Sequence, residues 1–164
     1  MGRYWVTSGH KHLANDEWLT PPWMIESLGP FDLDPCAAIK RPWETAQKYF
    51  TIEMDGLNQK WFGRVWVNPP YGRGLDQWII KASNHGNGLA IFPLRSTDTV
   101  WFHEAVWKRS SGILFVRGRV RFWTPDGIEG GPCPHSSIIV AWGQGNADVL
   151  EKAKIKGHFI RGIS

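Results

Sequence analysis

Continuous apolar runs of strand length recur along the chain and alternate with segments whose apolar residues follow the period of a helix. Residues 89–92, bounded by Gly88 and Pro93, are typical of a strand that is buried on both faces of a parallel sheet. Further strands are predicted at residues 31–34, 65–67, 113–116 and 137–142.

The predicted helices are marked by their end signals as well as by their period. Thr20 is the predicted N-cap of a helix that starts near Pro21 and stops at Gly29. A second helix places the apolar residues of 75–82 on one face and stops at Gly86. Other helices are predicted at residues 44–49, from a cap at Thr97 or Asp98 to Lys108, and after a cap at Asn146.

This alternation predicts an α/β fold with a mostly parallel sheet flanked by helices. Ligands of such sheets bind at the carboxyl ends of the strands. Residues 1–17 show no period and are predicted to form a basic N-terminal arm, which leaves residues 18–164 as a single domain. Residues 124–135 are rich in Gly and Pro and are predicted to form a loop, and the last residues read as a basic tail.

Two consecutive prolines follow the strand at residues 65–67 and force the chain out of the sheet. Because Pro69 and Pro70 have no N–H, this elbow offers hydrogen-bond acceptors, namely the Asn68 side-chain oxygen and nearby backbone carbonyls. Acceptors suit a planar amino group, and Tyr71 can lay its ring against a flat heterocycle. The alternative is an ordinary Pro-Pro turn with Tyr71 at the surface.

Charge points to an anionic partner without requiring one. The chain of 164 residues carries a net charge of +4 and contains eleven Trp, some of which are candidates for stacking on bases. Arg117, Arg119 and Arg121 stand at alternate positions, so an extended chain presents all three on one face that suits phosphates.

Cysteine usage and hydropathy give expectations about the compartment and about metals. Cys36 and Cys133 are too few for a disulfide framework, no apolar run reaches membrane-spanning length, and the N-terminus is polar, so the cytoplasm is expected. The two His/Cys clusters, at residues 10–12 and 133–135, lack a paired Cys-x-x-Cys. We therefore predict no metal site.

Three motifs occur in a characteristic order: Thr20-Pro21-Pro22 before a helix, Asp34-Pro35-Cys36-Ala37 at a strand end, and Asn68-Pro69-Pro70-Tyr71. In this order and spacing the chain resembles the phage-type DNA N6-adenine methyltransferases, the Dam-like family, from about Trp18 to Trp142. The resemblance implies a Rossmann-like methyltransferase fold, S-adenosylmethionine as methyl donor, double-stranded DNA as substrate, and a bacterial host cytoplasm. The chain departs from many methyltransferases in lacking a Gly-x-Gly signature after the first strand.

The resemblance also implies roles for individual residues. Asn68, Pro69, Pro70 and Tyr71 would form the catalytic elbow, with Tyr71 stacking on a flipped adenine. The implied cofactor contacts are Thr20 and Pro21 at the methionine part, Asp34, Pro35, Cys36 and Ala37 in the same pocket, and either Glu53 or Asp55 at the adenosine. The candidate DNA contacts come from charge and position and not from the resemblance: they are Arg95, Arg117, Arg119 and Arg121, with the Gly-rich loop to His135.

Two other kinds of function remain open from the sequence. An enzyme of the same fold can act on cytosine N4, on RNA adenine or on a protein glutamine. A non-catalytic, Trp-rich module that binds nucleic acid is the alternative from a different class. The sequence is compatible with a monomer or a homodimer.

Overall fold

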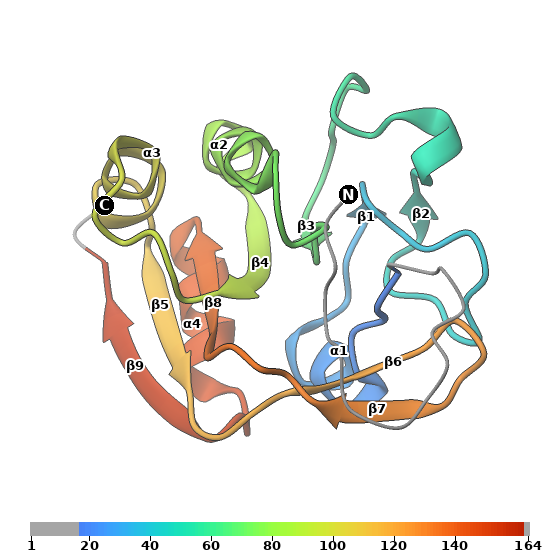
Figure 1. Cartoon of the computed structure of the whole chain (residues 1–164). Coiled ribbons are helices and arrows are strands. Elements are labelled where there is room, and N and C mark those ends of the chain that lie inside the picture. Colours follow the sequence, from blue (N-terminus) through green and yellow to red (C-terminus); the bar gives the residue numbers. More distant parts are fainter. Residues whose placement is uncertain (1–16, 163–164) are drawn as a thin grey trace.

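The framework of the protein, seen in the computed structural model that describes residues 17–162, is a seven-stranded sheet of order β2-β1-β3-β4-β8-β5-β9 (Figure 1). The strands are β1 (Leu33–Asp34), β2 (Lys48–Tyr49), β3 (Val65–Val67), β4 (Gly88–Pro93), β5 (Gly112–Val116), β8 (Ser137–Trp142) and β9 (Gly157–Arg161). Neighbours from β2 to β4 are parallel, whereas β8 is antiparallel to β4 and β5, and β9 is antiparallel to β5. The α/β class is confirmed, and the sheet is mixed.

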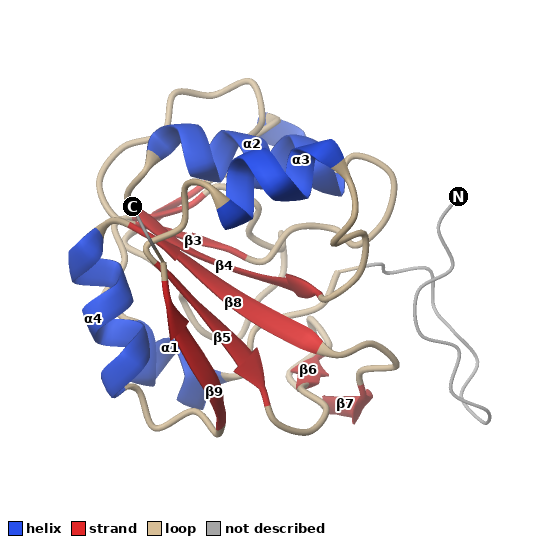
Figure 2. Cartoon of the chain, turned by 90° about the vertical axis from the view of Figure 1, so that its left-hand side faces the viewer, coloured by secondary structure: helices blue, strands red, loops and turns tan. Residues whose placement is uncertain are grey.

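Helices cover both faces of the sheet (Figure 2). One face carries α1 (Pro22–Leu28) and α4 (Gln144–Lys152), and the other carries α2 (Leu75–His85) and α3 (Val100–Phe102), which continues as the π-helical turn η2 (His103–Trp107). A separate two-stranded ribbon, β6 (Arg121–Trp123) with β7 (Glu129–Pro132), lies beside α1, and a short helix η1 (Ile52–Met54) follows β2. None of the helices within residues 17–162 has both the length and the apolar character needed to cross a bilayer.

The core is built on the central strands. Every residue of β3, β4 and β8 is buried, as the continuous apolar runs predicted. Two indoles at the centre keep their N–H groups bonded: Trp66 Nε1 donates to Thr20 Oγ1 at 2.9 Å, and Trp142 Nε1 donates to the Ala105 carbonyl at 2.9 Å. Large aromatic side chains are therefore accommodated here without an orphaned polar atom.

Several predicted helix ends differ in the structure because their side chains have other partners. Thr20 is not the N-cap of α1; its hydroxyl accepts from Trp66, and Pro21 occupies the cap position. The cap of α3 is Thr99, whose side chain accepts from Phe102 N, and neither Thr97 nor Asp98 takes that role. Asn146 lies inside the first turn of α4, where its amide donates to the Trp142 carbonyl at 2.7 Å.

Three segments pair as strands where the sequence indicated something else. The helix predicted at residues 44–49 is wrong, because Lys48 and Tyr49 form β2 beside β1. The loop at residues 124–135 contains β7, and the basic tail contains β9. The predicted arm lies outside the described residues apart from Glu17.

Candidate active site

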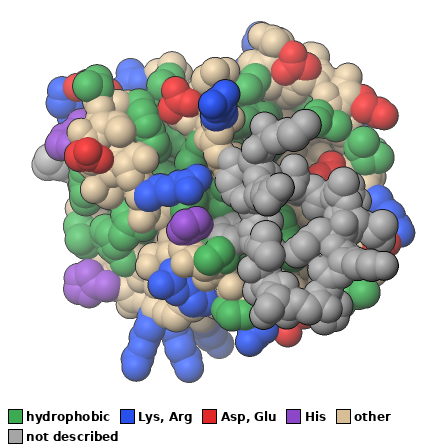
Figure 3. Space-filling model, in the orientation of Figure 1, with side chains coloured by type: hydrophobic (Ala, Val, Ile, Leu, Met, Phe, Trp, Pro, Cys, Tyr) green, Lys and Arg blue, Asp and Glu red, His purple; other side chains and the backbone are tan. Residues whose placement is uncertain are grey.

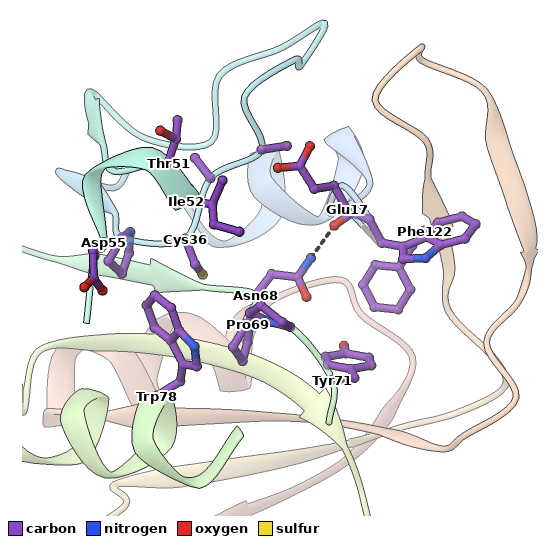
Figure 4. A pocket seen from close by; sticks show the side chains of 16 residues that line it. Glu17, Cys36, Thr51, Ile52, Asp55, Asn68, Pro69, Tyr71, Trp78 and Phe122 are labelled. Atoms are coloured by element: carbon purple, nitrogen blue, oxygen red, sulfur yellow. Dashed lines mark hydrogen bonds between the residues drawn. The ribbon is translucent and has the colours of Figure 1, made fainter. Parts of the chain in front are cut away.

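The site lies where β1 and β3 end, because these parallel neighbours bring their carboxyl ends to one edge of the sheet. A cavity of about 360 Å³ opens at this edge (Figure 4). Its walls come from six parts of the chain: residues 17–18, the loop after β1, the segment around η1, the elbow after β3, α2 and β6. The elbow and the loop after β1 thus share one cavity, as the sequence predicted.

Asn68 is held in one orientation by the backbone. Its Nδ2 donates to the Trp18 carbonyl at 2.8 Å, the bond drawn in Figure 4. Within residues 17–162 no donor is bonded to Oδ1, so this oxygen remains available as an acceptor in the cavity wall. Asn68, Pro69, Pro70 and Tyr71 all line the cavity.

Tyr71 forms a wall of the cavity and is more buried than a surface turn residue would be, at 8% exposed. Its ring meets that of Phe122 at right angles, with 6.0 Å between centroids. Burial raises the pKa of the Tyr71 phenol well above its usual value, so the group stays protonated at neutral pH. Phe122 comes from β6, on which strand alternation turns Phe122 inward and exposes Arg121.

Asp34 serves its own loop rather than the main cavity. Its Oδ1 accepts from the Cys36 N–H at 3.0 Å, and its Oδ2 accepts from the Thr45 hydroxyl. Burial raises the pKa of this carboxyl to about 6, although the two hydrogen bonds and the Arg41 charge act in the opposite direction. These bonds shape the turn that presents Pro35, Cys36 and Ala37 to the cavity.

The far end of the cavity combines an acid with apolar surface. Both predicted acids are exposed, but Asp55 lines the cavity and Glu53 does not, which favours Asp55 between the two. Trp78 also lines it and stacks on Trp61 with 6.1 Å between ring centroids. A Cβ on Gly56 would lie 1.9 Å from the Pro35 carbonyl oxygen, so the close approach of these two walls requires glycine.

Other predicted cofactor residues lie outside this cavity. Thr20 and Asp34 line a smaller neighbouring cavity of about 20 Å³, and Pro21 lines neither cavity. Cys36, Ala37 and Asn68 line both cavities, so Thr20 and Asp34 do share a pocket with Cys36, although the Thr20 hydroxyl is engaged by Trp66 and the Asp34 carboxylate by its own loop. The roles assigned to the residues that do line the main cavity stay predictions.

Several residues that line the cavity were not predicted from the sequence, namely Trp18, Ile52, Trp78 and Phe122. Trp78 falls on the apolar face of a predicted helix, so its period indicated only core packing. Phe122 alternates with charged and aromatic neighbours on β6, but nothing local shows that this ribbon lies against the elbow.

The predicted DNA contacts divide into two groups. Arg95 follows β4, the neighbour of β3 in the sheet, and does not line the main cavity. Arg117, Arg119 and Arg121 line a separate groove of about 350 Å³ and do not line the main cavity. In the part of the chain that the structure describes, no three His, Cys, Asp or Glu side chains cluster as metal ligands would.

The protein has a mixed sheet flanked by helices and a cavity at the carboxyl ends of parallel strands. These features are those of the broad class of α/β ligand-binding domains. The family model described as DNA N-6-adenine-methyltransferase (Dam) matches residues 7–145. The chain therefore belongs to the Dam family of DNA N-6-adenine methyltransferases, which confirms the resemblance drawn from the three motifs. No curated protein and no solved structure matches the chain.

Proposed function

We propose that this protein is a DNA adenine-N6 methyltransferase of Rossmann-like fold that uses S-adenosylmethionine. The observation that carries the proposal is the held amide of Asn68, whose Nδ2 is bonded to the Trp18 carbonyl while Oδ1 stays available in the cavity. An oriented acceptor beside the carbonyl of Pro69 suits an exocyclic amine with two hydrogens. Membership of the Dam family supports adenine in DNA as the source of that amine.

Methyl transfer to an adenine amine requires the protein to align a weak nucleophile. The lone pair of an adenine amine is delocalised into the ring, so it must be turned toward the electrophile. Asn68 Oδ1 and the Pro69 carbonyl would accept the two amine hydrogens and fix that direction. When the nitrogen gains positive charge, the same two acceptors bind its protons more strongly, which stabilises the transition state.

The cavity residues fit S-adenosylmethionine, which supplies an electrophilic methyl group when bound. A volume of about 360 Å³ lies within the range of small-molecule sites, about 300–1,000 Å³. Small residues after β1 leave the backbone accessible, and Ile52 and Trp78 give apolar surface for a planar ring. Asp55 would accept a hydrogen bond from the adenosine part.

The target adenine must leave the duplex to reach Asn68, because its amine is enclosed by base pairing and stacking. Beside Asn68 it would meet the rings of Tyr71 and Phe122, which lie in contact in this structure. Arg95, which follows β4, would contact a phosphate near the extruded nucleotide.

Incubation with methyl-labelled S-adenosylmethionine and unmethylated duplex DNA, followed by nucleoside digestion, is expected to place the label in N6-methyldeoxyadenosine. Label in cytosine, or in RNA or protein offered in parallel, would assign the elbow to another amine. Absence of label on every substrate would support a non-catalytic nucleic-acid-binding module instead.

Replacement of Asp55 by Asn is expected to weaken binding of S-adenosylhomocysteine by about 10- to 100-fold, because a hydrogen bond to a charged group contributes about 1.5–3 kcal/mol. Titration calorimetry measures this directly. The matched variant Glu53→Gln removes an acid that is exposed and outside the cavity, so its affinity should stay within about twofold. The opposite ranking would assign the adenosine to Glu53.

A further inference from the structure

A second hollow on the molecule is basic and is distinct from the cavity at Asn68. This hollow, here called the basic groove, has a volume of about 350 Å³. Its cations come from two segments: residues 117–121, between β5 and β6, and residues 154–156, just before β9. Figure 3 shows Lys and Arg side chains gathered along the lower edge of the molecule, where Figure 1 places the end of β5 and the start of β9.

The charge of the basic groove is largely uncompensated. Arg117, Arg119, Arg121, Lys154 and Lys156 line it, together with a single acid, Glu129. Among residues 17–162 none of these five cations forms an ion pair, whereas other exposed cations of the protein do. Cations on facing walls without acidic partners indicate a ligand that brings several negative charges.

The basic groove also contains apolar side chains, which phosphates alone would not contact. Val120 and Ile155 are buried beneath it, and Trp23 of α1 lines it with 47% of its surface exposed. A duplex presents sugar and phosphate to such a surface and keeps the faces of its bases stacked inside. A single strand presents base faces, which stack on exposed aromatic rings while the cations follow the backbone.

The loop at residues 134–136 connects Arg95 with the basic groove. Leu94, next to Arg95, donates its N–H to the Ser136 carbonyl at 2.8 Å, and Arg119 Nη1 donates to the Pro134 carbonyl at 3.1 Å. Strand β6 separates the two hollows by its own thickness, since Phe122 lines the cavity and Arg121 lines the basic groove. A strand that enters the cavity with one nucleotide can therefore continue over β6.

We propose that the duplex opens next to the extruded adenine and that the basic groove binds the unpaired stretch of the target strand there, with Trp23 as a stacking platform and the Arg and Lys side chains on its phosphates. This inference rests on the proposed function for the choice of DNA as the partner. None of the groove residues takes part in methyl transfer, so the two can be tested apart.

The test measures the affinity of the full chain for a fluorescein-labelled oligothymidylate of about 12 nucleotides by anisotropy. This probe contains no adenine and cannot be methylated. The double variant Lys154→Glu/Lys156→Glu is expected to weaken binding at least 10-fold at low salt and to lower the slope of log affinity against log salt by about 1.4. Trp23→Ala should weaken binding several-fold with an unchanged slope, and Trp23→Phe should restore it.

The matched control is Lys48→Glu/Lys60→Glu, which changes the charge equally with exposed lysines outside the basic groove. Equal loss in the groove and control variants would overturn the proposal. So would an all-G·C duplex that binds as tightly as the oligothymidylate and is insensitive to Trp23→Ala, because the surface would then be a duplex contact. Tight oligothymidylate binding by a protein that methylates no DNA would overturn only the proposed function.

Discussion

Asn68→Ala is expected to lower the rate of methyl transfer to DNA by at least about 100-fold, the effect of removing one preorganised group that stabilises developing charge. The variant deletes the acceptor Oδ1 and the donor that fixes it on the Trp18 carbonyl. Affinity for S-adenosylhomocysteine should change little, because the walls near Asp55 and Trp78 are untouched. Single-turnover transfer of labelled methyl groups gives the rate, and calorimetry gives the affinity.

Asn84→Ala is the matched control, since Asn84 is exposed on α2 and, within residues 17–162, its side chain accepts only from the Arg109 guanidinium. Thermal unfolding of both variants separates loss of chemistry from loss of fold. Transfer by Asn68→Ala at more than a tenth of the normal rate would exclude Asn68 from alignment of the amine.

Asp34→Asn is expected to raise the free energy of unfolding at pH 8 by up to about 3 kcal/mol. Burial raises the pKa of this carboxyl from 3.8 to about 6 in the folded protein, so folding favours its protonated form. The stability that this group contributes is therefore complete below pH 4 and is lost as the pH rises through 6. An Asn side chain stays neutral and keeps an oxygen for the Cys36 N–H.

Urea unfolding of both proteins from pH 4 to pH 8 measures this effect. The gap between Asp34→Asn and the natural protein should open as the pH rises between 4 and 7 and then stay constant. A constant gap across this range would show that Asp34 keeps its ordinary pKa. If the methionine ammonium of the cofactor lies near Asp34, the same variant should bind S-adenosylhomocysteine more weakly, and the carboxylate is then retained for binding at a cost in stability.

Elements with strong local signals could be predicted from the sequence. The apolar run at residues 89–92 became β4, Gly86 ends α2 with a positive φ of 73°, and the two prolines after β3 form the elbow. Each of these depends on residues that are neighbours in the chain. The Asn-Pro-Pro-Tyr motif is also a run of neighbouring residues, and its place at a strand end could be predicted.

The rest depends on pairing between distant segments. An apolar run such as β8 carries no sign of its direction, so its antiparallel place between β4 and β5 could not be predicted. Strand β2 is exposed at both residues and is defined by its backbone bonds to β1. The orientation of Asp34 depends on Thr45, eleven positions away, and no local pattern reports that bond.

Residues 18–20 link the β6–β7 hairpin to Asn68, which limits how that hairpin can be exchanged. The first holds the Asn68 amide, the second pairs with Trp123 of β6 in both directions, at 2.7 and 3.0 Å, and the third accepts from the indole of Trp66. A β6–β7 hairpin transplanted from a relative to alter target preference would bring its own backbone to Leu19. Unless the graft preserves that pairing, we expect the exchange also to loosen Asn68, which we propose aligns the amine.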